Sequence, residues 1–205
     1  MLIRIEGFPH IIGCGVLALL LKRTRLKYAG LVPLLFTTWF FRDPVREPPA
    51  QAGTVLSPAD GTVLEVSETT EERVGPCTKV AVFMSVFNVH VNRVPVDAEV
   101  LDKIYKPGAF RVASLGKKTE DNERMILYIK HPTMGIMRVD QVAGLIARRI
   151  HCWPEKGDHI TQGARFGLIR FGSLLECYVP QGVQVIVRKG DKVYAGQTIL
   201  GRMPS

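Results

Sequence analysis

Two short apolar segments followed by a proline-rich segment constrain the fold of this chain most. Residues 7–21 and 28–41 contain no charged side chain, and the basic segment 22–27 separates them. The next segment, 42–49, contains three prolines, which cannot continue a helix because proline lacks a backbone N–H. From there on, apolar segments are short and are interrupted by glycine and proline, which is typical of strands and turns. The sequence therefore predicts a helical hydrophobic hairpin followed by a mainly β protein.

The apolar segments are each shorter than the roughly 20 residues that a membrane-spanning helix needs. A secretory signal peptide is disfavoured, because Arg4 is the one basic residue before the first segment and no small-residue cleavage site follows Leu21. We expect a re-entrant or monotopic anchor, with Pro33 helping to break the second segment and Trp39 at the membrane interface. A pair of buried core helices is the alternative that these lengths leave open.

The formal net charge of +8 is concentrated near the N-terminus. Residues 1–47 hold seven Lys and Arg side chains, Arg46 among them, against three acidic ones, and so carry half of the net charge. Basic residues beside apolar helices suit an anionic lipid surface, although a solvated basic face would look the same. We expect a peripheral or monotopic protein of the cytoplasmic membrane whose β domain faces the cytoplasm. Without aromatic residues interleaved in a basic motif, nucleic acid is not an expected partner.

The four cysteines, at positions 14, 77, 152 and 177, lack metal-site or redox spacing. We interpret them as reduced, mostly buried thiols and expect no metal.

The domain boundaries follow from these patterns. We expect a hydrophobic hairpin over residues 1–41, a proline-rich linker over 42–50 and a catalytic β domain over 51–205. Val, Ile and Tyr with partial alternation mark the expected strands. These are Thr62–Ser67, Lys79–Met84, Ala98–Tyr105, Met125–His131, Gly135–Val142, Gly167–Phe171, Glu176–Val179 and Gln184–Arg188.

A weak internal repeat supports the β assignment. Residues 157–167 and 190–200 share a Gly-Asp pair, an apolar residue two positions later and a glycine three positions after that. The Gly-Asp pair suits a tight turn, and the second glycine suits a positive φ. The pattern is similar to the lipoyl/biotinyl type of barrel-sandwich hybrid, whose strands form two quasi-equivalent halves.

Three motifs carry candidate chemistry: residues 57–63 (SPADGTV), 88–95 (NVHVNRVP) and 170–173 (RFGS). A Gly-Ser pair alone is weak evidence, because turns are rich in such pairs. In this order, however, the motifs resemble the small membrane-associated phosphatidylserine decarboxylase family, which includes archaetidylserine decarboxylase-like members. The resemblance covers residues from about 36 to the C-terminus. It implies that the chain cuts itself between Gly172 and Ser173, giving a β chain of residues 1–172 and an α chain of residues 173–205.

Cleavage at this pair requires the Ser173 hydroxyl to attack the Gly172 carbonyl, which converts the amide into an ester. A serine hydroxyl is too weak a nucleophile without a base, and the base needs an orienting partner. His90 and Asp60 are the candidates for these two roles. Elimination of the ester would leave dehydroalanine at position 173, which hydrolyses to a pyruvoyl group with loss of ammonia.

The resemblance implies that this pyruvoyl group, derived from Ser173, replaces pyridoxal phosphate as the electron sink. The expected reaction converts phosphatidylserine into phosphatidylethanolamine and CO2, with His90 returning a proton to the carbanion. Longer family members carry His-x-x-His where this chain has His90 and Arg93. Either His90 serves both maturation and decarboxylation, which we expect, or Arg93 or a water molecule takes one of the two roles. The short relatives usually have Arg and Val after the Gly-Ser pair, where this chain has Leu174 and Leu175.

Other functions stay open at this point. The fold also suits a lipoyl, biotinyl or phosphoryl carrier, although no lysine lies at a typical modification site. The changed flank after Ser173 would fit a membrane-tethered lipid-binding module that is never cut. The expected partners are an anionic phospholipid substrate and the membrane surface. We also expect a heterodimer of the chain's own α and β parts, and the resemblance suggests a homo-oligomer.

Overall fold

The structure, a computed structural model, describes residues 2–110, 121–144, 149–170 and 173–204. Its internal contacts divide the chain into two compact units, Met1–Val45 and Arg46–Ser205. The division falls within the segment 42–50 that the prolines mark as a linker. Each unit is described by itself.

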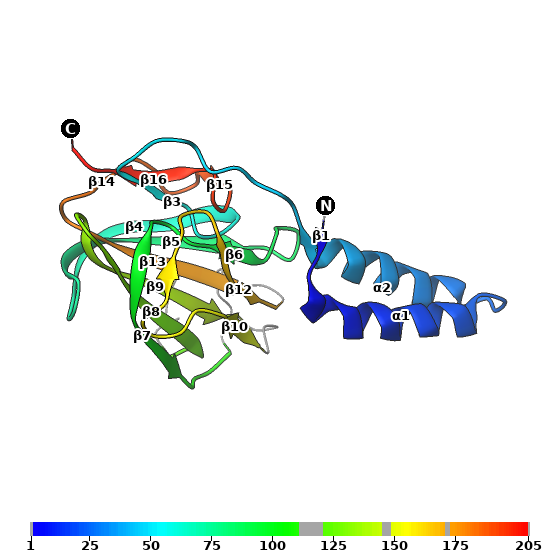
Figure 1. The fold of residues 1–205 in the computed structure, drawn as a ribbon. Coiled ribbons are helices and arrows are strands. Elements are labelled where there is room, and N and C mark those ends of the chain that lie inside the picture. The colour runs from blue at the N-terminus through cyan, green and yellow to red at the C-terminus, as the bar shows by residue number, and fades with distance from the viewer. Residues whose placement is uncertain (1, 111–120, 145–148, 171–172, 205) are drawn as a thin grey trace. The chain divides into compact units, whose positions relative to one another are not determined.

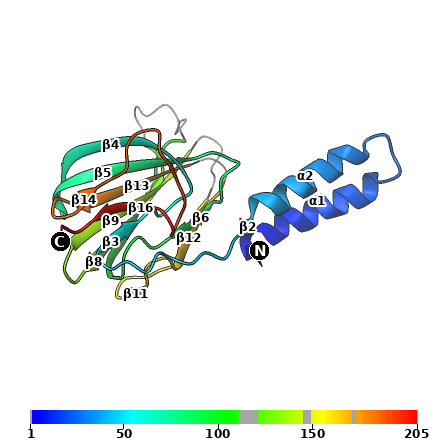
Figure 2. The same ribbon diagram turned by 90° about the horizontal axis from the view of Figure 1, so that it is seen from above.

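The N-terminal unit is a hairpin of two antiparallel helices that lie side by side (Figures 1 and 2). Glycine allows their close approach, because a Cβ on Gly30 would collide with the backbone of Ala18. A two-residue antiparallel pairing of β1 with β2 joins the ends of the hairpin. The elements are β1 (Leu2–Ile3), the 3-10 helix η1 (Ile5–Gly7), α1 (Phe8–Leu21), α2 (Lys27–Phe40) and β2 (Arg42–Asp43).

The expectation that Pro33 helps to break the second apolar segment is wrong, because α2 continues through it. Proline removes one backbone hydrogen bond, but its fixed φ is close to the helical value. The hydroxyl of Thr37 donates to the Pro33 carbonyl at 2.8 Å, so this hydroxyl has a hydrogen-bond partner within the helix. Among the residues that the structure describes, no helix is both long enough and apolar enough to cross a membrane.

The second unit is mainly β, as the sequence predicts, and its described strands form three antiparallel sheets (Figure 1). The large sheet has the order β11 (His159–Ile160), β7 (Ala98–Lys106), β8 (Arg124–His131), β9 (Gly135–Ala143), β13 (Ser173–Pro180), β5 (Gly75–Met84), β4 (Gly61–Glu71) and β15 (Lys192–Val193). One small sheet contains β10 (Ile150–Cys152), β12 (Arg165–Ile169) and β6 (Val91–Arg93). The other contains β14 (Gln184–Val185), β16 (Ile199–Arg202) and β3 (Thr54–Leu56).

Each of the eight predicted strands overlaps an observed one. The segment 184–188 is strand only at Gln184–Val185, and Phe171 lies outside the described residues. The strands that the sequence did not reveal have two to four residues, too few to show an alternating pattern.

The predicted repeat is present as two turns with the same backbone bonds. Val63 exchanges both of its backbone hydrogen bonds with the turn at residues 190–191, and Val100 does the same with the turn at 157–158. The second glycines of the repeat, Gly163 and Gly196, have φ values of +76° and +69°. The expectation of a positive φ at these positions is therefore confirmed.

The repeat extends to segments 56–63 and 93–100, which bond to each other reciprocally. Leu56 N donates to Pro95 O at 2.9 Å, and Arg93 N donates to Pro58 O at 2.9 Å. The two segments therefore occupy equivalent positions in the two halves of the β unit.

The large sheet buries both of its faces around β13. Side chains on one face alternate with those on the other along a strand. Leu175 and Cys177 belong to the main core, whereas Leu174 packs with Ala81 and Val142 in a smaller cluster on the opposite face. Ser173, the first residue of β13, therefore begins a strand that is packed on both faces.

Candidate active site

Ser173 is the first residue of β13 and lies between two neighbouring strands. It pairs with Met84 of β5 on one side and with Ala143 of β9 on the other. Its side chain is fully buried, and within the described part of the chain its Oγ has no hydrogen-bond partner. A buried hydroxyl without a partner costs about 1–3 kcal/mol, so its presence calls for an explanation such as a catalytic role. Gly172, the other half of the predicted cleavage site, lies outside the described residues.

His90 precedes β6 and is also fully buried. Its Nδ1 lies 3.0 Å from the Asn88 carbonyl oxygen. Because a carbonyl can only accept, Nδ1 is assigned the hydrogen and Nε2 the basic lone pair. The His90 carbonyl accepts a bond from Ile169 N at 3.4 Å, and Ile169 ends β12 four residues before Ser173. The pairing of β6 with β12 therefore places His90 beside Ile169, at the end of β12.

A tight turn fixes the Asn88 carbonyl that holds His90. The Asn88 Oδ1 accepts bonds from Ser85 N at 2.9 Å and from Ser85 Oγ at 2.8 Å, and Asn88 N donates to Ser85 O at 2.9 Å. Ser85 directly follows Met84, the partner of Ser173. The same short segment therefore positions both the histidine and the serine.

Asp60 is buried immediately before β4, and both of its carboxylate oxygens face Arg46. Arg46 Nη2 donates to Oδ2 at 2.7 Å, and Arg46 Nη1 donates to Oδ1. Oδ1 also accepts a bond from Ala195 N at 2.8 Å. The sequence counted Arg46 only as part of the basic N-terminal charge, so this contact was missed. The role of Asp60 as the orienting partner of His90 stays a prediction.

Strand register places Asp60 at the same end of the large sheet as Ser173. Thr62 of β4 pairs with Phe83 of β5, and the next β5 residue pairs with Ser173. With strands about 4.8 Å apart, the backbones of β4 and β13 are separated by about 10 Å. Gly61 is needed in this register, because a Cβ there would collide with the Phe83 carbonyl. The structure thus brings all three predicted catalytic residues that it describes to one end of the β unit.

Two buried side-chain amides, those of Asn92 and Gln141, lie close to the strands that flank Ser173. The Asn92 Nδ2 is 3.6 Å from the sulfur of Met84, and Asn92 Oδ1 accepts a bond from Gln141 Nε2 at 2.8 Å. Gln141 lies two residues before Ala143 in β9, and its buried Oε1 has no partner among the described atoms. Asn92 lies in a motif that the sequence singled out, whereas Gln141 is a mid-strand residue that carried no such signal.

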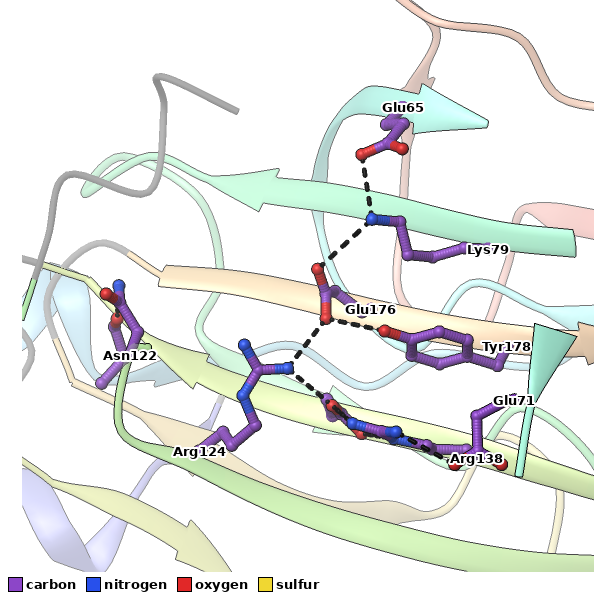
Figure 3. A network of polar contacts seen from close by, with 10 residues as sticks. Glu65, Glu71, Lys79, Asn122, Arg124, Arg138, Glu176 and Tyr178 are labelled. Atoms are coloured by element: carbon purple, nitrogen blue, oxygen red, sulfur yellow. Dashed lines mark hydrogen bonds and ion pairs between the residues drawn. The ribbon is translucent and has the colours of Figure 1, made fainter. Parts of the chain in front are cut away.

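The opposite face of β13 carries a network of charged groups (Figure 3). Glu176 accepts bonds from Arg124 and from the Tyr178 hydroxyl, both at 3.2 Å. Arg124 also binds Asp140 at 3.0 Å, and Lys79 lies 3.9 Å from Glu176. Burial, together with repulsion from Asp140, raises the pKa of Glu176. These contacts fix β13 from the face opposite to the Ser173 side chain.

Comparison with known proteins agrees with these motifs. A model of the phosphatidylserine decarboxylase family matches residues 34–201. This chain belongs to the phosphatidylserine decarboxylase family. The match spans the segments around Asp60, His90 and Ser173, and membership identifies the chain as an enzyme of the decarboxylase type.

Similar members of the phosphatidylserine decarboxylase family cover almost the whole chain. The chain is 43% identical to a phosphatidylserine decarboxylase proenzyme of Syntrophus aciditrophicus (strain SB), over 96% of this chain and 95% of that protein. It is 45% identical to the proenzyme of Geobacter metallireducens, over 97% and 95%. It is 48% identical to that of Beijerinckia indica subsp. indica, over 95% and 87%. The family expected from the three motifs is therefore confirmed.

Proposed function

We propose that this chain converts phosphatidylserine into phosphatidylethanolamine and CO2, using a pyruvoyl group formed from Ser173. The observation that carries the proposal is the buried Ser173 hydroxyl, which has no hydrogen-bond partner in the described structure. It begins a central strand in a chain whose similar relatives are named proenzymes. A lipoyl-type carrier has no comparable support.

Maturation begins when the Ser173 Oγ attacks the Gly172 carbonyl carbon, while His90 Nε2 takes the hydroxyl proton. The tautomer set by the Asn88 carbonyl supports this role, because it leaves Nε2 as the base. The peptide bond to Ser173 N breaks, and an ester to Oγ forms. Loss of the Cα proton then expels the Gly172 carboxylate and leaves dehydroalanine. Addition of water and release of ammonia give the pyruvoyl group at position 173.

The buried surroundings of Ser173 fit this group, since the side chain, whose hydroxyl has no partner in the described structure, becomes an apolar methyl group, while the keto oxygen takes the place of the Ser173 nitrogen that leaves as ammonia. When formed, the pyruvoyl group supplies the electron sink that pyridoxal phosphate supplies elsewhere. His90 Nε2, once protonated, delivers a proton after CO2 leaves. The Gln141 Oε1 is a buried acceptor suited to the amine of the serine headgroup.

The α and β chains stay together after cleavage. β13 forms the start of the α chain, and it is hydrogen-bonded along its length to β5 and along most of its length to β9. Both of these strands belong to the β chain. Cutting the chain before Ser173 leaves these ladders in place, so the mature protein is a heterodimer of its own two parts. The resemblance adds a homo-oligomer to this proposal.

The helical hairpin anchors the enzyme at the cytoplasmic membrane as a peripheral or monotopic protein, with the β unit facing the cytoplasm. Large apolar side chains are exposed along both helices, which is unfavourable in water. They include Ile12, Val16, Leu19 and Leu20 of α1 and Leu31, Val32 and Leu35 of α2. The basic residues of segment 22–27 lie at the turn between the helices and suit anionic headgroups.

Intact-mass spectrometry of the purified protein tests the maturation. The expected result is two chains, the smaller beginning at position 173 and lighter by one ammonia than a serine-initiated fragment. The Ser173→Ala variant should remain whole. Activity is then measured as CO2 released from phosphatidylserine in mixed micelles. A wild-type chain that stays full length under native conditions would contradict the proposal and favour an unprocessed lipid-binding module.

A further inference from the structure

The two halves of the β unit each contain an aspartate at the same position of a Pro-x-Asp sequence. Asp60 lies in segment 56–63, and Asp97 lies in the equivalent segment 93–100. Asp60 Oδ1 accepts a bond from Ala195 N at 2.8 Å, and Asp97 Oδ1 accepts one from Gln162 N at 2.8 Å. Both donors belong to the repeated turn sequences. Both aspartates therefore stabilise the repeated turn.

The two carboxylates differ in burial and in ion pairing. Asp97 is exposed to solvent, whereas Asp60 is only 4% exposed. Asp60 has Arg46 as an additional partner, and the Arg46 side chain is itself only 8% exposed. Among the described ion pairs none involves Asp97. Asp60, the candidate orienting partner of His90, is thus the turn aspartate that is buried and paired.

The contacts of Arg46 fix its guanidinium in one orientation. Its Nη1 donates to the Ala195 carbonyl at 2.9 Å as well as to Asp60, and its Nη2 donates to the other oxygen of Asp60. A two-bond pairing of arginine with a carboxylate sets the plane of both groups. Lysine, as a point charge, cannot reproduce this geometry.

We propose that Arg46 is a positioning residue for self-cleavage. It holds the Asp60 carboxylate in a fixed plane, so that this group stabilises the positive charge that His90 acquires when it takes the Ser173 proton. The inference rests on the proposed maturation and adds to it the first residue of the β unit. Arg46 does not touch the reacting atoms and acts through Asp60.

The test follows the rate at which newly synthesised full-length chain is cut, by gel and by intact mass. Arg46→Ala should slow cleavage by about 100-fold, the loss typical of a misplaced catalytic group. Arg46→Lys should lie between that variant and the wild type. Arg73→Ala is the matched control, because it removes an arginine that pairs with Asp102 at 2.9 Å near the far end of β4 and β5. It should cleave like the wild type.

Chemical rescue separates positioning from support of the fold. Guanidinium ion added to the Arg46→Ala protein should restore cleavage in a saturable way, and it should not restore cleavage of Asp60→Asn. Asp97→Asn, which alters the equivalent turn, should leave the rate unchanged. Slow cleavage of Arg46→Ala with a lowered melting temperature and no rescue would reduce Arg46 to a structural residue and overturn the proposal.

Two further outcomes would overturn the proposal about Arg46, and a third would refute the proposed function. If Arg46→Ala fails to fold, Arg46→Lys decides, and wild-type cleavage by that variant overturns the proposal. The proposal is also overturned if Arg46→Ala cleaves normally while Asp60→Asn does not. Failure of the wild-type chain to cleave would instead refute the proposed function itself, which the wild-type mass spectrum reveals before any variant is compared.

Discussion

Ser173 lies directly opposite Met84 in the ladder of β13 and β5, and the sulfur of Met84 is in contact with the Asn92 amide. Asn92 is in turn bonded to Gln141, which lies beside β13 in β9. Ser173 therefore lies close to a pair of buried polar side chains from β6 and β9, which Met84 of β5 contacts. This pair links the Asn92-Arg93 part of the second motif to the predicted cleavage site.

Removing one member of the amide pair should destabilise the fold. Asn92→Ala removes the 2.8 Å acceptor of Gln141 Nε2 and leaves it only the bond to the His151 carbonyl at 3.2 Å; loss of one buried hydrogen bond costs about 0.5–1.5 kcal/mol. The measurement is urea unfolding in the uncut Ser173→Ala background, so that one chain is followed. A double-mutant cycle with Gln141→Ala should give a combined loss smaller than the sum of the single losses. Strictly additive losses would contradict the coupling.

His90 can be tested with a variant that keeps its bond to Asn88. In His90→Asn the side-chain amide can still donate to the Asn88 carbonyl, but the basic Nε2 is absent. We expect cleavage to slow by about 10²- to 10⁴-fold, the range for loss of a general base. The melting temperature should change little. His131→Asn, at the end of β8, is the control and should cleave normally. Normal cleavage by His90→Asn would exclude His90 as the base.

The sequence predicted the parts of the fold that local rules govern. The alternation in strands such as Gly135–Val142 and the glycines at 163 and 196 reflect constraints that act within a few residues. Strands of two or three residues, such as β11 and β15, are held by partners far away in sequence, so no local pattern reveals them. The hairpin helix α2 also passes through Pro33 against the local rule.

The residues of the candidate site are likewise of two kinds, those that sequence motifs identify and those that only the folded structure reveals. Asp60, His90 and Ser173 lie in motifs that can be recognised in the sequence, and the structure brings them to one end of the β unit. Arg46 meets Asp60 only because the chain folds back over it, and no spacing rule connects positions 14 residues apart in a linker and a turn. Gln141 lies in the middle of a strand and is distinguished only by what packs beside it.

The pH dependence of stability should reveal the buried Glu176. Because burial and Asp140 raise its pKa, its contribution is present below about pH 4.3, the ordinary glutamate pKa, and is lost as the pH rises through the folded value. Glu176→Gln cannot ionise, so its melting temperature relative to wild type should increase between about pH 4 and pH 7. Glu65 is the matched control of opposite sign. Although burial opposes it, bonds from Ser67 and Lys79 lower its pKa, so Glu65→Gln should lose stability relative to wild type as the pH rises from the lowered folded pKa to the ordinary value of about 4.3, and should show no further change above it.

The repeated turns allow backbone strain to be separated from crowding. Gly157 has φ +91° and open space where an added methyl group would lie, so Gly157→Ala should cost about 1–2 kcal/mol from the left-handed conformation alone. Gly163, at φ +76°, would in addition place its Cβ against the ring of Pro48. Gly163→Ala should therefore be clearly the less stable of the two in denaturant unfolding. Equal losses would show that the Pro48 contact yields without cost.

The basic turn of the hairpin should control binding to anionic membranes. Lys22, Arg23 and Arg25 follow α1, and each basic residue near an anionic surface contributes about 1 kcal/mol. Replacing all three by Gln should weaken binding to phosphatidylglycerol-containing vesicles by about 100-fold at low salt, and the difference should shrink as salt screens the charges. Vesicle flotation measures both effects. The control replaces three exposed lysines of the β unit by Gln, namely Lys130, Lys156 and Lys189. Because these lie on the other unit, that variant should bind like the wild type. An equal loss in both triple variants would mean that total charge, and not the hairpin turn, determines attachment.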